Sequence, residues 1–187
     1  MTKDTNYIKK TSIPELFVIE RPTFTDERGF FREIFRLDDL EREVGIKFCI
    51  VQVNHARSHP NVIRALHAEN WNKLVYPVRG KVFLAIVDIR PDSPTFAKHE
   101  TFNFDNNSHK ALFISKGLAN SICVDGDEDV DYLYLVDAYY DGKDTTAVAW
   151  DDPDLDIKWP VKNPIISERD RKNPTLRELF PEKFEKK

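Results

Sequence analysis

The sequence predicts an all-β domain built as a sandwich or barrel. Short β-patterned segments recur at roughly 8–12-residue spacing, separated by Gly, Asp, Asn and Pro, with almost no helix between them. The 187 residues are enough for one domain with a substantial core. The aromatic content (13 Phe, 6 Tyr and 3 Trp) favours a β-rich core or a pocket that stacks on rings.

The N-terminal part predicts two strands and one helix. Residues 13–20 form the first strand, and residues 30–35 the second. Between them, residues 25–29 form a turn in which Asp opens the turn and Gly supplies a positive φ. After the second strand, apolar residues recur at helical spacing among charges, and a glycine ends the predicted helix. The residues of this helix pattern are Leu37, Leu40, Val44 and the terminating Gly45.

The rest of the chain predicts a rapid succession of strands. Residues 46–54 are β-patterned and 58–61 form a turn, and further strands are expected at residues 74–78, 81–89, 99–104, 110–114, 130–138 and 145–150. Residues 151–164 look irregular, Ser167 caps a short helical segment, and residues 184–187 are expected to fray. With no internal repeat, the chain is predicted to be one domain over residues 1–187, with a core at about 13–178 and peripheral ends at 1–10 and 182–187.

Composition excludes several classes of protein. The net charge of −4 and a pI of about 5.8 argue against a general nucleic-acid or anionic-membrane binder. No segment approaches the ~18 apolar residues of a transmembrane helix, and the N-terminus lacks a signal-peptide pattern. Cys49 and Cys123 lie in apolar runs without CxxC spacing, so both are expected to be buried thiols in a cytoplasmic protein.

Arg64, His67 and Lys73 place two cations around an imidazole where a β-domain would normally carry apolar residues. An imidazole can take a proton from carbon if a nearby cation stabilises the resulting anion. The pattern therefore indicates proton abstraction next to a carbonyl, although a lone histidine is often structural. Arg64 and His67 would face opposite sides of a regular strand, so both reach one pocket only if the backbone there is irregular.

Other polar groups could complete such a site. Arg28 could join Arg64 and Lys73 in an anion cradle, against the alternative of scattered surface cations. Gln52 and Asn54 place two amides on one strand face, where they could read a nucleobase or sugar, or simply form an exposed polar face.

Two tyrosines are candidates for a general acid. Tyr132 and Tyr134 share a strand face, and one phenol could protonate a carbanion from the side opposite the imidazole. The alternative is a pair of core aromatics.

A metal site is weakly supported. Metal-binding double-stranded barrels often carry an HxH…E set and a later His, but here Glu69 stands two residues after His67, where the second His is expected. Asn120 occupies the later position, so three good ligands cannot be assembled, and no metal is expected.

Eight motifs occur in order from about residue 13 to about residue 178. They are residues 24–33 (FTDERGFFRE), 52–54 (QVN), 62–67 (VIRALH), 73–75 (KLV), 87–96 (VDIRPDSPTF), 150–153 (WDDP), 157–160 (IKWP) and 166–170 (ISERD). Each motif alone is weak, but their order across one domain is a strong signal. Together they resemble the dTDP-4-dehydrorhamnose 3,5-epimerase family of sugar-nucleotide epimerases.

The resemblance implies a cupin-like double-stranded β-helix, or jelly-roll barrel, with short peripheral helices. It implies epimerisation of a nucleoside-diphosphate 4-keto-6-deoxy sugar at C3 and/or C5, without metal or redox cofactor, in a homodimer whose subunits exchange N-terminal strands. His67 would be the base, oriented by Asp170, and Tyr134 the acid, while Lys73 and Arg64 would hold the diphosphate and sugar oxygens. The nucleotide contacts would be Arg28, Glu33, Gln52 and Asn54, and further substrate contacts Asn120 and Arg169.

Four positions depart from the family pattern. Ala65 replaces a usual Gly, Ala56 a usual Ser and Asn120 a usual His near the sugar, while Thr145 stands where many members carry an acidic ligand. Several alternatives therefore remain for the chemistry: an epimerase acting on another nucleotide sugar such as a GDP-4-keto heptose or at one carbon only, a 3,4-ketoisomerase, a metal-dependent cupin, or a barrel that binds sugar nucleotides without turnover.

Overall fold

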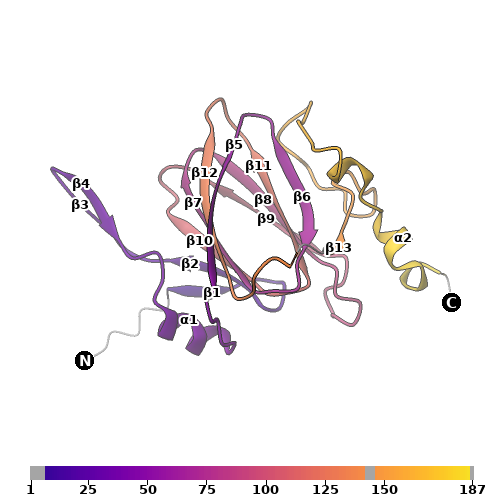
Figure 1. The fold of residues 1–187 in the computed structure, drawn as a ribbon, viewed down its shortest axis with the longest axis horizontal. Coiled ribbons are helices and arrows are strands. Elements are labelled where there is room, and N and C mark those ends of the chain that lie inside the picture. Colours follow the sequence, from indigo (N-terminus) through magenta and orange to yellow (C-terminus); the bar gives the residue numbers. More distant parts are fainter. Residues whose placement is uncertain (1–6, 142–145, 186–187) are drawn as a thin grey trace.

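The computed structural model describes residues 7–141 and 146–185 and confirms an all-β fold (Figure 1). Two antiparallel sheets face each other as in a cupin-like jelly roll. The first sheet has the order β1 (Ile8–Lys10), β2 (Leu16–Glu20), β10 (Lys110–Ile114), β7 (Lys73–Arg79), β12 (Val130–Val136) and β5 (Gln52–Ser58). The second has the order β13 (Thr146–Ala147), β6 (Ile63–Ala68), β11 (Leu118–Val124), β8 (Val82–Asp88) and β9 (His99–Phe104).

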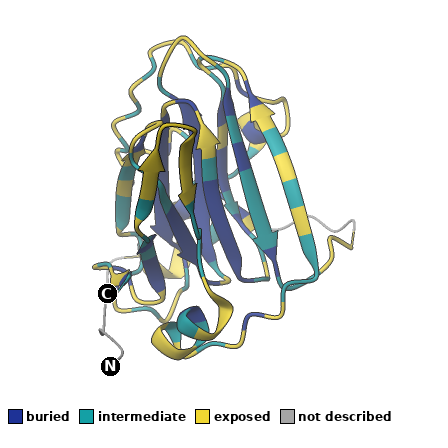
Figure 2. Ribbon diagram, turned by 90° about the vertical axis from the view of Figure 1, so that its left-hand side faces the viewer, coloured by how far each residue is buried: buried dark blue, intermediate teal, exposed yellow. Residues whose placement is uncertain are grey.

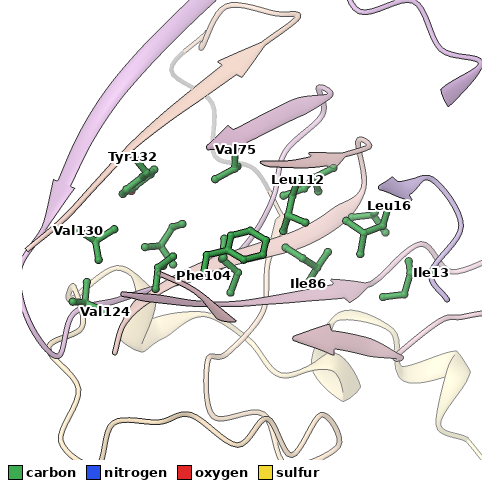
Figure 3. Close-up of a cluster of buried hydrophobic side chains, with 14 residues drawn as sticks. Ile13, Leu16, Val75, Ile86, Phe104, Leu112, Val124, Val130 and Tyr132 are labelled. Atoms are coloured by element: carbon green, nitrogen blue, oxygen red, sulfur yellow. The ribbon is translucent and has the colours of Figure 1, made fainter. Parts of the chain in front are cut away.

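Alternating residues of the central strands fill two apolar layers. On β8, Val82, Leu84 and Ile86 pack between the sheets, while Phe83 and Ala85 pack on the outer face of the second sheet. The inner layer draws side chains from both sheets (Figure 3). The outer layer is covered by the C-terminal region, so β8 is buried on both faces and reads as a continuous apolar run.

Strand β11 was not predicted from the sequence, although all seven of its residues are buried. Its apolar run is interrupted by Asn120 and Ser121, which resembles a turn signal. The structure satisfies both polar side chains inside the sheet. Ser121 accepts a hydrogen bond from the Ala85 amide and donates one to the Ala85 carbonyl, so a polar residue lies in the core at little cost.

The N-terminal region adds a helix and a projecting hairpin to the sandwich. Helix α1 (Leu37–Val44) buries Leu40 on the outer face of the first sheet and ends at Gly45 with φ 74°, as predicted. The hairpin formed by β3 (Thr23–Asp26) and β4 (Gly29–Arg32) extends away from the body (Figure 1), and most of it is coloured as exposed in Figure 2. Its aromatic side chains are at least 61% exposed, an unusual position for three phenylalanines: Phe24, Phe30 and Phe31.

Two predictions about side-chain burial were wrong. Cys123 is buried as expected, but Cys49 is exposed, because it follows the fully buried Phe48 and points away from the sheet that Phe48 covers. Phe184 was assigned to a frayed end, yet its ring packs 6.3 Å from Phe96 with the Arg177 guanidinium over it. Aromatic packing therefore anchors the chain as far as Phe184. None of the described helices is long and apolar enough to cross a membrane.

The C-terminal region carries short helices on the second sheet. A 3₁₀ turn (Asp170–Lys172) begins where the Ser167 hydroxyl accepts a hydrogen bond from the Asp170 amide, close to the predicted cap. A second helix, α2 (Leu176–Leu179), starts with a capping box between Thr175 and Glu178 and is followed by a 3₁₀ turn (Pro181–Lys183).

Asp88 anchors the turn that follows β8 and should contribute measurably to stability. Burial alone would raise the pKa of Asp88, but hydrogen bonds from Arg90, Ser93 and Thr95 outweigh it and lower the pKa to about 2. We expect Asp88→Asn to lower the free energy of unfolding by about 2 kcal/mol at pH 7.

The pH dependence of this effect has a defined sign. Because the folded-state pKa is depressed, the contribution is present above pH ~4 and is lost as the pH falls toward 2. Urea unfolding between pH 7 and pH 3 should show the wild type and Asp88→Asn converging at the acid end. The matched control is Asp92→Asn, an exposed residue of the same turn. A constant difference across this range would contradict the assignment.

Candidate active site

A cavity of about 570 Å³ lies between the two sheets, beside the inner apolar layer. Val75, Ile122 and Tyr132 belong both to that layer and to the cavity wall. The polar side chains that line the cavity come from β6, β7, β11, β12 and the 165–170 segment. They are Arg64, His67, Glu69, Lys73, Asn120, Tyr132, Tyr134, Ser167, Arg169 and Asp170.

A bulge in β6 brings Arg64 and His67 to the same cavity. In the pairing with β11, His67 is opposite Asn120 and Arg64 is opposite Ile122, so two β6 residues face only one on the partner strand. The two bulged residues, Ala65 and Leu66, are both fully buried. The irregular backbone that the sequence required for a common pocket is therefore present.

His67 and Asp170 form a hydrogen-bonded pair at the cavity wall. Nε2 of His67 lies 2.7 Å from Oδ1 of Asp170, and the carboxylate side chain is only 5% exposed. Burial would raise the pKa of Asp170, but the hydrogen bond and charge of His67, with a hydrogen bond from the Ala65 amide, lower the pKa below its usual value. The ionised carboxylate accepts the proton of Nε2, which leaves Nδ1 as the basic nitrogen of the ring.

Tyr134 lies on β12 in the opposite sheet and lines the same cavity. Its ring stacks on Tyr132 with centroids 6.2 Å apart, and the Lys73 ammonium lies 5.3 Å from its centroid. Burial and then the charge of Glu69 raise the pKa of the Tyr134 phenol, while Arg64 opposes the shift. Tyr134 is therefore a protonated acid at neutral pH, across the cavity from a protonatable base.

Lys73 is a buried cation with two partners that the sequence pattern did not predict. Its Nζ donates to Oε1 of Glu69 at 2.5 Å and to Oδ1 of Asn120 at 3.4 Å. Glu69 was considered only as an incomplete metal ligand. The available signal was its spacing, since a residue two positions after His67 continues on the same side of the strand.

A smaller cavity of about 270 Å³ shares His67, Glu69 and Tyr134 with the first. Gln52 and Asn54 both line it, which confirms that the two amides share a face. Its remaining polar and aromatic lining includes Trp71, Tyr140 and Arg169. Nδ2 of Asn54 and Nε1 of Trp71 are buried without a hydrogen-bond partner among the described residues, so two donors are available to a ligand.

Two sequence-predicted site residues lie elsewhere in this chain. Arg28 sits on the hairpin and pairs with Asp26, and Glu33 pairs with Arg21 and Arg36. The structure of one chain does not bring them to His67.

The positions that depart from the family pattern have different locations. Ala56 lines the larger cavity, and Ala65 is one of the two bulged residues. Thr145 lies outside the described residues. In the described part of the chain, no group of three or more His, Cys, Asp or Glu side chains is arranged to hold a metal ion.

Comparison with known proteins identifies a family of sugar-nucleotide epimerases. Residues 10–178 match the model of the family described as dTDP-4-dehydrorhamnose 3,5-epimerase. The chain is 39% identical over 165 residues to the dTDP-4-dehydrorhamnose 3,5-epimerase of Shigella flexneri, covering 86% of this chain and 91% of the relative. It is 36% identical over 172 residues to the Salmonella typhimurium enzyme of the same name, covering 89% and 93% of the two chains.

A solved structure agrees with these relatives. The chain resembles a dTDP-6-deoxy-D-glucose-3,5-epimerase from Legionella pneumophila in complex with dTDP-4-keto-L-rhamnose. The TM-score is 0.86 at 34% identity, and the match covers 94% of this chain and 95% of the other.

Proposed function

Since this chain belongs to the dTDP-4-dehydrorhamnose 3,5-epimerase family, we propose that it inverts C3 and C5 of a dTDP-4-keto-6-deoxy sugar within a single domain. It is an isomerase of deoxysugar biosynthesis. One observation carries the proposed mechanism. A base held by a carboxylate and a protonated phenol reach one cavity from opposite sheets.

The proposed reaction begins with proton removal next to the ketone. The 4-keto group acidifies the hydrogens on C3 and C5, and His67 takes one of them through its basic nitrogen. The negative charge moves to the former ketone oxygen, where the Lys73 ammonium stabilises it. Tyr134 then gives a proton to the opposite face of the same carbon, which inverts the centre. Asp170 keeps the proton on Nε2 of His67 throughout.

The nucleotide end of the substrate fits the smaller cavity. Gln52 and Asn54 offer amide groups there, and Arg169 lines both cavities and can contact the diphosphate that joins the two halves. Arg64 is fixed by donating to the Ser58 hydroxyl at 2.9 Å and faces the larger cavity. We assign Arg64 to the same anionic group.

The proposed assembly is a homodimer that exchanges its N-terminal hairpins. The exposed phenylalanines of β3 and β4 need a partner surface, and Arg28 on the hairpin lines neither the larger nor the smaller cavity described above. A second copy of the chain provides a surface on which the rings can pack. Its cavity also lacks the nucleotide contacts that we assign to Arg28 and Glu33, and the hairpin of the first copy can supply them. The hairpin of each subunit would then complete the site of the other.

Mixed dimers test this exchange. Arg28→Ala and His67→Asn should each impair the homodimer, but subunits mixed after unfolding and refolding should regain about a quarter of wild-type activity. Half of the dimers are then mixed, and one of the two sites in each mixed dimer carries both native residues. If confirmed mixed dimers regain no activity, hairpin exchange is contradicted. Without exchange, Arg28 and His67 of one subunit serve the same site, so every site in a mixed dimer carries one of the two substitutions.

Product analysis tests the activity itself. Incubation with dTDP-4-keto-6-deoxyglucose should yield dTDP-4-dehydrorhamnose, observed by NMR as a product that keeps its ketone at C4. GDP- and CDP-linked 4-keto sugars run in parallel should react more slowly. A product with its ketone at C3 would instead identify a 3,4-ketoisomerase, and faster turnover of the GDP sugar would reassign the nucleotide.

A further inference from the structure

Glu69 connects the two walls of the larger cavity. It directly follows β6 of the second sheet, whereas Lys73 begins β7 of the first. Oε1 of Glu69 accepts from the Lys73 ammonium at 2.5 Å, and Oε2 accepts from Nδ2 of Asn120 at 2.9 Å. The Lys73 and Glu69 side chains are only 8% and 15% exposed. Removing one partner of such a buried pair leaves the other charge uncompensated.

Asn120 completes the cluster and has no donor left for a ligand. Its Nδ2 gives one hydrogen to the His67 carbonyl at 2.7 Å and the other to Glu69. Its Oδ1 accepts from Lys73 at 3.4 Å, and the residue is 8% exposed. Asn120 was predicted to be a substrate contact. Its hydrogen bonds instead let it act on the substrate through Lys73, Glu69 and the strand that carries His67.

The Tyr134 phenol is the third group that this cluster faces. The charges that act on the phenol are the Glu69 carboxylate and the Arg64 guanidinium, and the Lys73 ammonium lies 5.3 Å from the centroid of its ring. The same cavity is also lined by Tyr132, which stacks on the ring, by Arg169, and by Asp170, whose carboxylate is paired with His67. If Glu69 is neutralised, the phenol keeps the influence of Arg64 and Lys73 and loses the carboxylate that opposes them. Cations favour the phenolate, which cannot donate a proton.

We propose that Glu69 is a positioning residue that fixes the Lys73 ammonium on the cavity wall and balances the cations beside the Tyr134 phenol. The inference rests on the proposed function, because that function gives Lys73 and Tyr134 their roles. Glu69 itself acts through these two residues, and Asn120 holds its second oxygen.

Glu69→Gln tests the charge while keeping the size of the side chain. ¹³C NMR of the tyrosine Cζ atoms follows each phenol through its titration, and Tyr134→Phe identifies the Tyr134 signal. In Glu69→Gln, we expect the Tyr134 midpoint to fall by about one pH unit. Tyr139, which is exposed and lines neither cavity, should keep its midpoint. The matched control is Glu168→Gln, which removes an exposed carboxylate outside the cavity lining.

The titration can overturn the inference in two ways. An unchanged Tyr134 midpoint in folded Glu69→Gln would contradict the proposal that the Glu69 charge balances the cations beside the phenol. An equal fall of the Tyr134 midpoint in Glu168→Gln would show that the loss of any carboxylate lowers this midpoint, so the effect would not be specific to Glu69. Neither outcome depends on enzyme activity, so the titration remains decisive even if the wild type fails to turn over the proposed substrate.

Kinetics separate positioning from substrate binding. On the dTDP sugar, Glu69→Gln should lower kcat about ten-fold or more, with a smaller change in KM, because the ammonium is misplaced relative to the reacting oxygen. The alkaline limb of its pH–rate profile should move down together with the Tyr134 midpoint. Wild-type kcat and an unshifted profile in Glu69→Gln would contradict the positioning role, whereas an inactive wild type would contradict the proposed function.

Discussion

Replacing His67 with Asn should reduce the incorporation of solvent deuterium at C3 and C5 by about 10³-fold. The substitution removes the base, and Asp170, which now accepts from Nε2 of His67 at 2.7 Å, keeps its hydrogen bond from the Ala65 amide. The fold should therefore survive, as circular dichroism can check. Deuterium incorporation is measured by NMR of the dTDP sugar after incubation in D₂O.

His59→Asn is the matched control for this experiment. His59 also pairs with an aspartate, at 2.9 Å from Asp129, but its side chain is 75% exposed and lies outside both cavities. We expect its exchange rate to stay within about two-fold of wild type. Near-normal exchange in folded His67→Asn would end the assignment of His67 as the base.

Tyr134→Phe should separate proton exchange from inversion. The base can still form the enolate, but the proton donor on the opposite face is missing, so inversion should slow by about 100-fold while exchange continues. The ring that stacks on Tyr132 is retained, so packing should change little. NMR in D₂O measures both quantities in one sample, as deuterated starting sugar and as inverted product.

Tyr132→Phe shows whether the effect belongs to position 134. Tyr132 is more deeply buried and its hydroxyl bonds to Ser58, so it is a poorer donor to substrate. The Tyr132→Phe protein should invert the sugar at least about ten-fold faster than the Tyr134→Phe protein. If Tyr134→Phe inverts as fast as wild type, the acid is elsewhere, and Tyr140 in the smaller cavity is the next candidate.

The sequence predicted the fold class and most strands because their apolar residues alternate between two buried layers. It failed at β11, where Asn120 and Ser121 imitate a turn although their hydrogen bonds are satisfied inside the sheet. Strand parity placed Gln52 and Asn54 on one face correctly. Strand parity also showed that Arg64 and His67 can reach one pocket only if the backbone between them is irregular. The position of the bulge, however, follows only from the pairing of β6 with β11.

The polar cluster around Lys73 and the contribution of a second subunit were harder to predict from the sequence. The partnership of Glu69 with Lys73 spans a connection between sheets, and the role of Asn120 depends on three hydrogen bonds that no local pattern encodes. Glu33 is predicted through the family resemblance and Arg28 also as a member of an anion cradle, and one chain leaves both away from the cavity. In the homodimer that we propose, their contribution depends on a second subunit, which neither strand periodicity nor local charge pattern describes.

We propose that the residues of this cavity remove and return protons at the carbons beside a 4-keto group. The most direct test is incubation of the wild-type protein with dTDP-4-keto-6-deoxyglucose in D₂O, followed by NMR at C3 and C5. We expect deuterium at both carbons together with inverted configuration. Recovery of the sugar with its original hydrogens at C3 and C5 would contradict it.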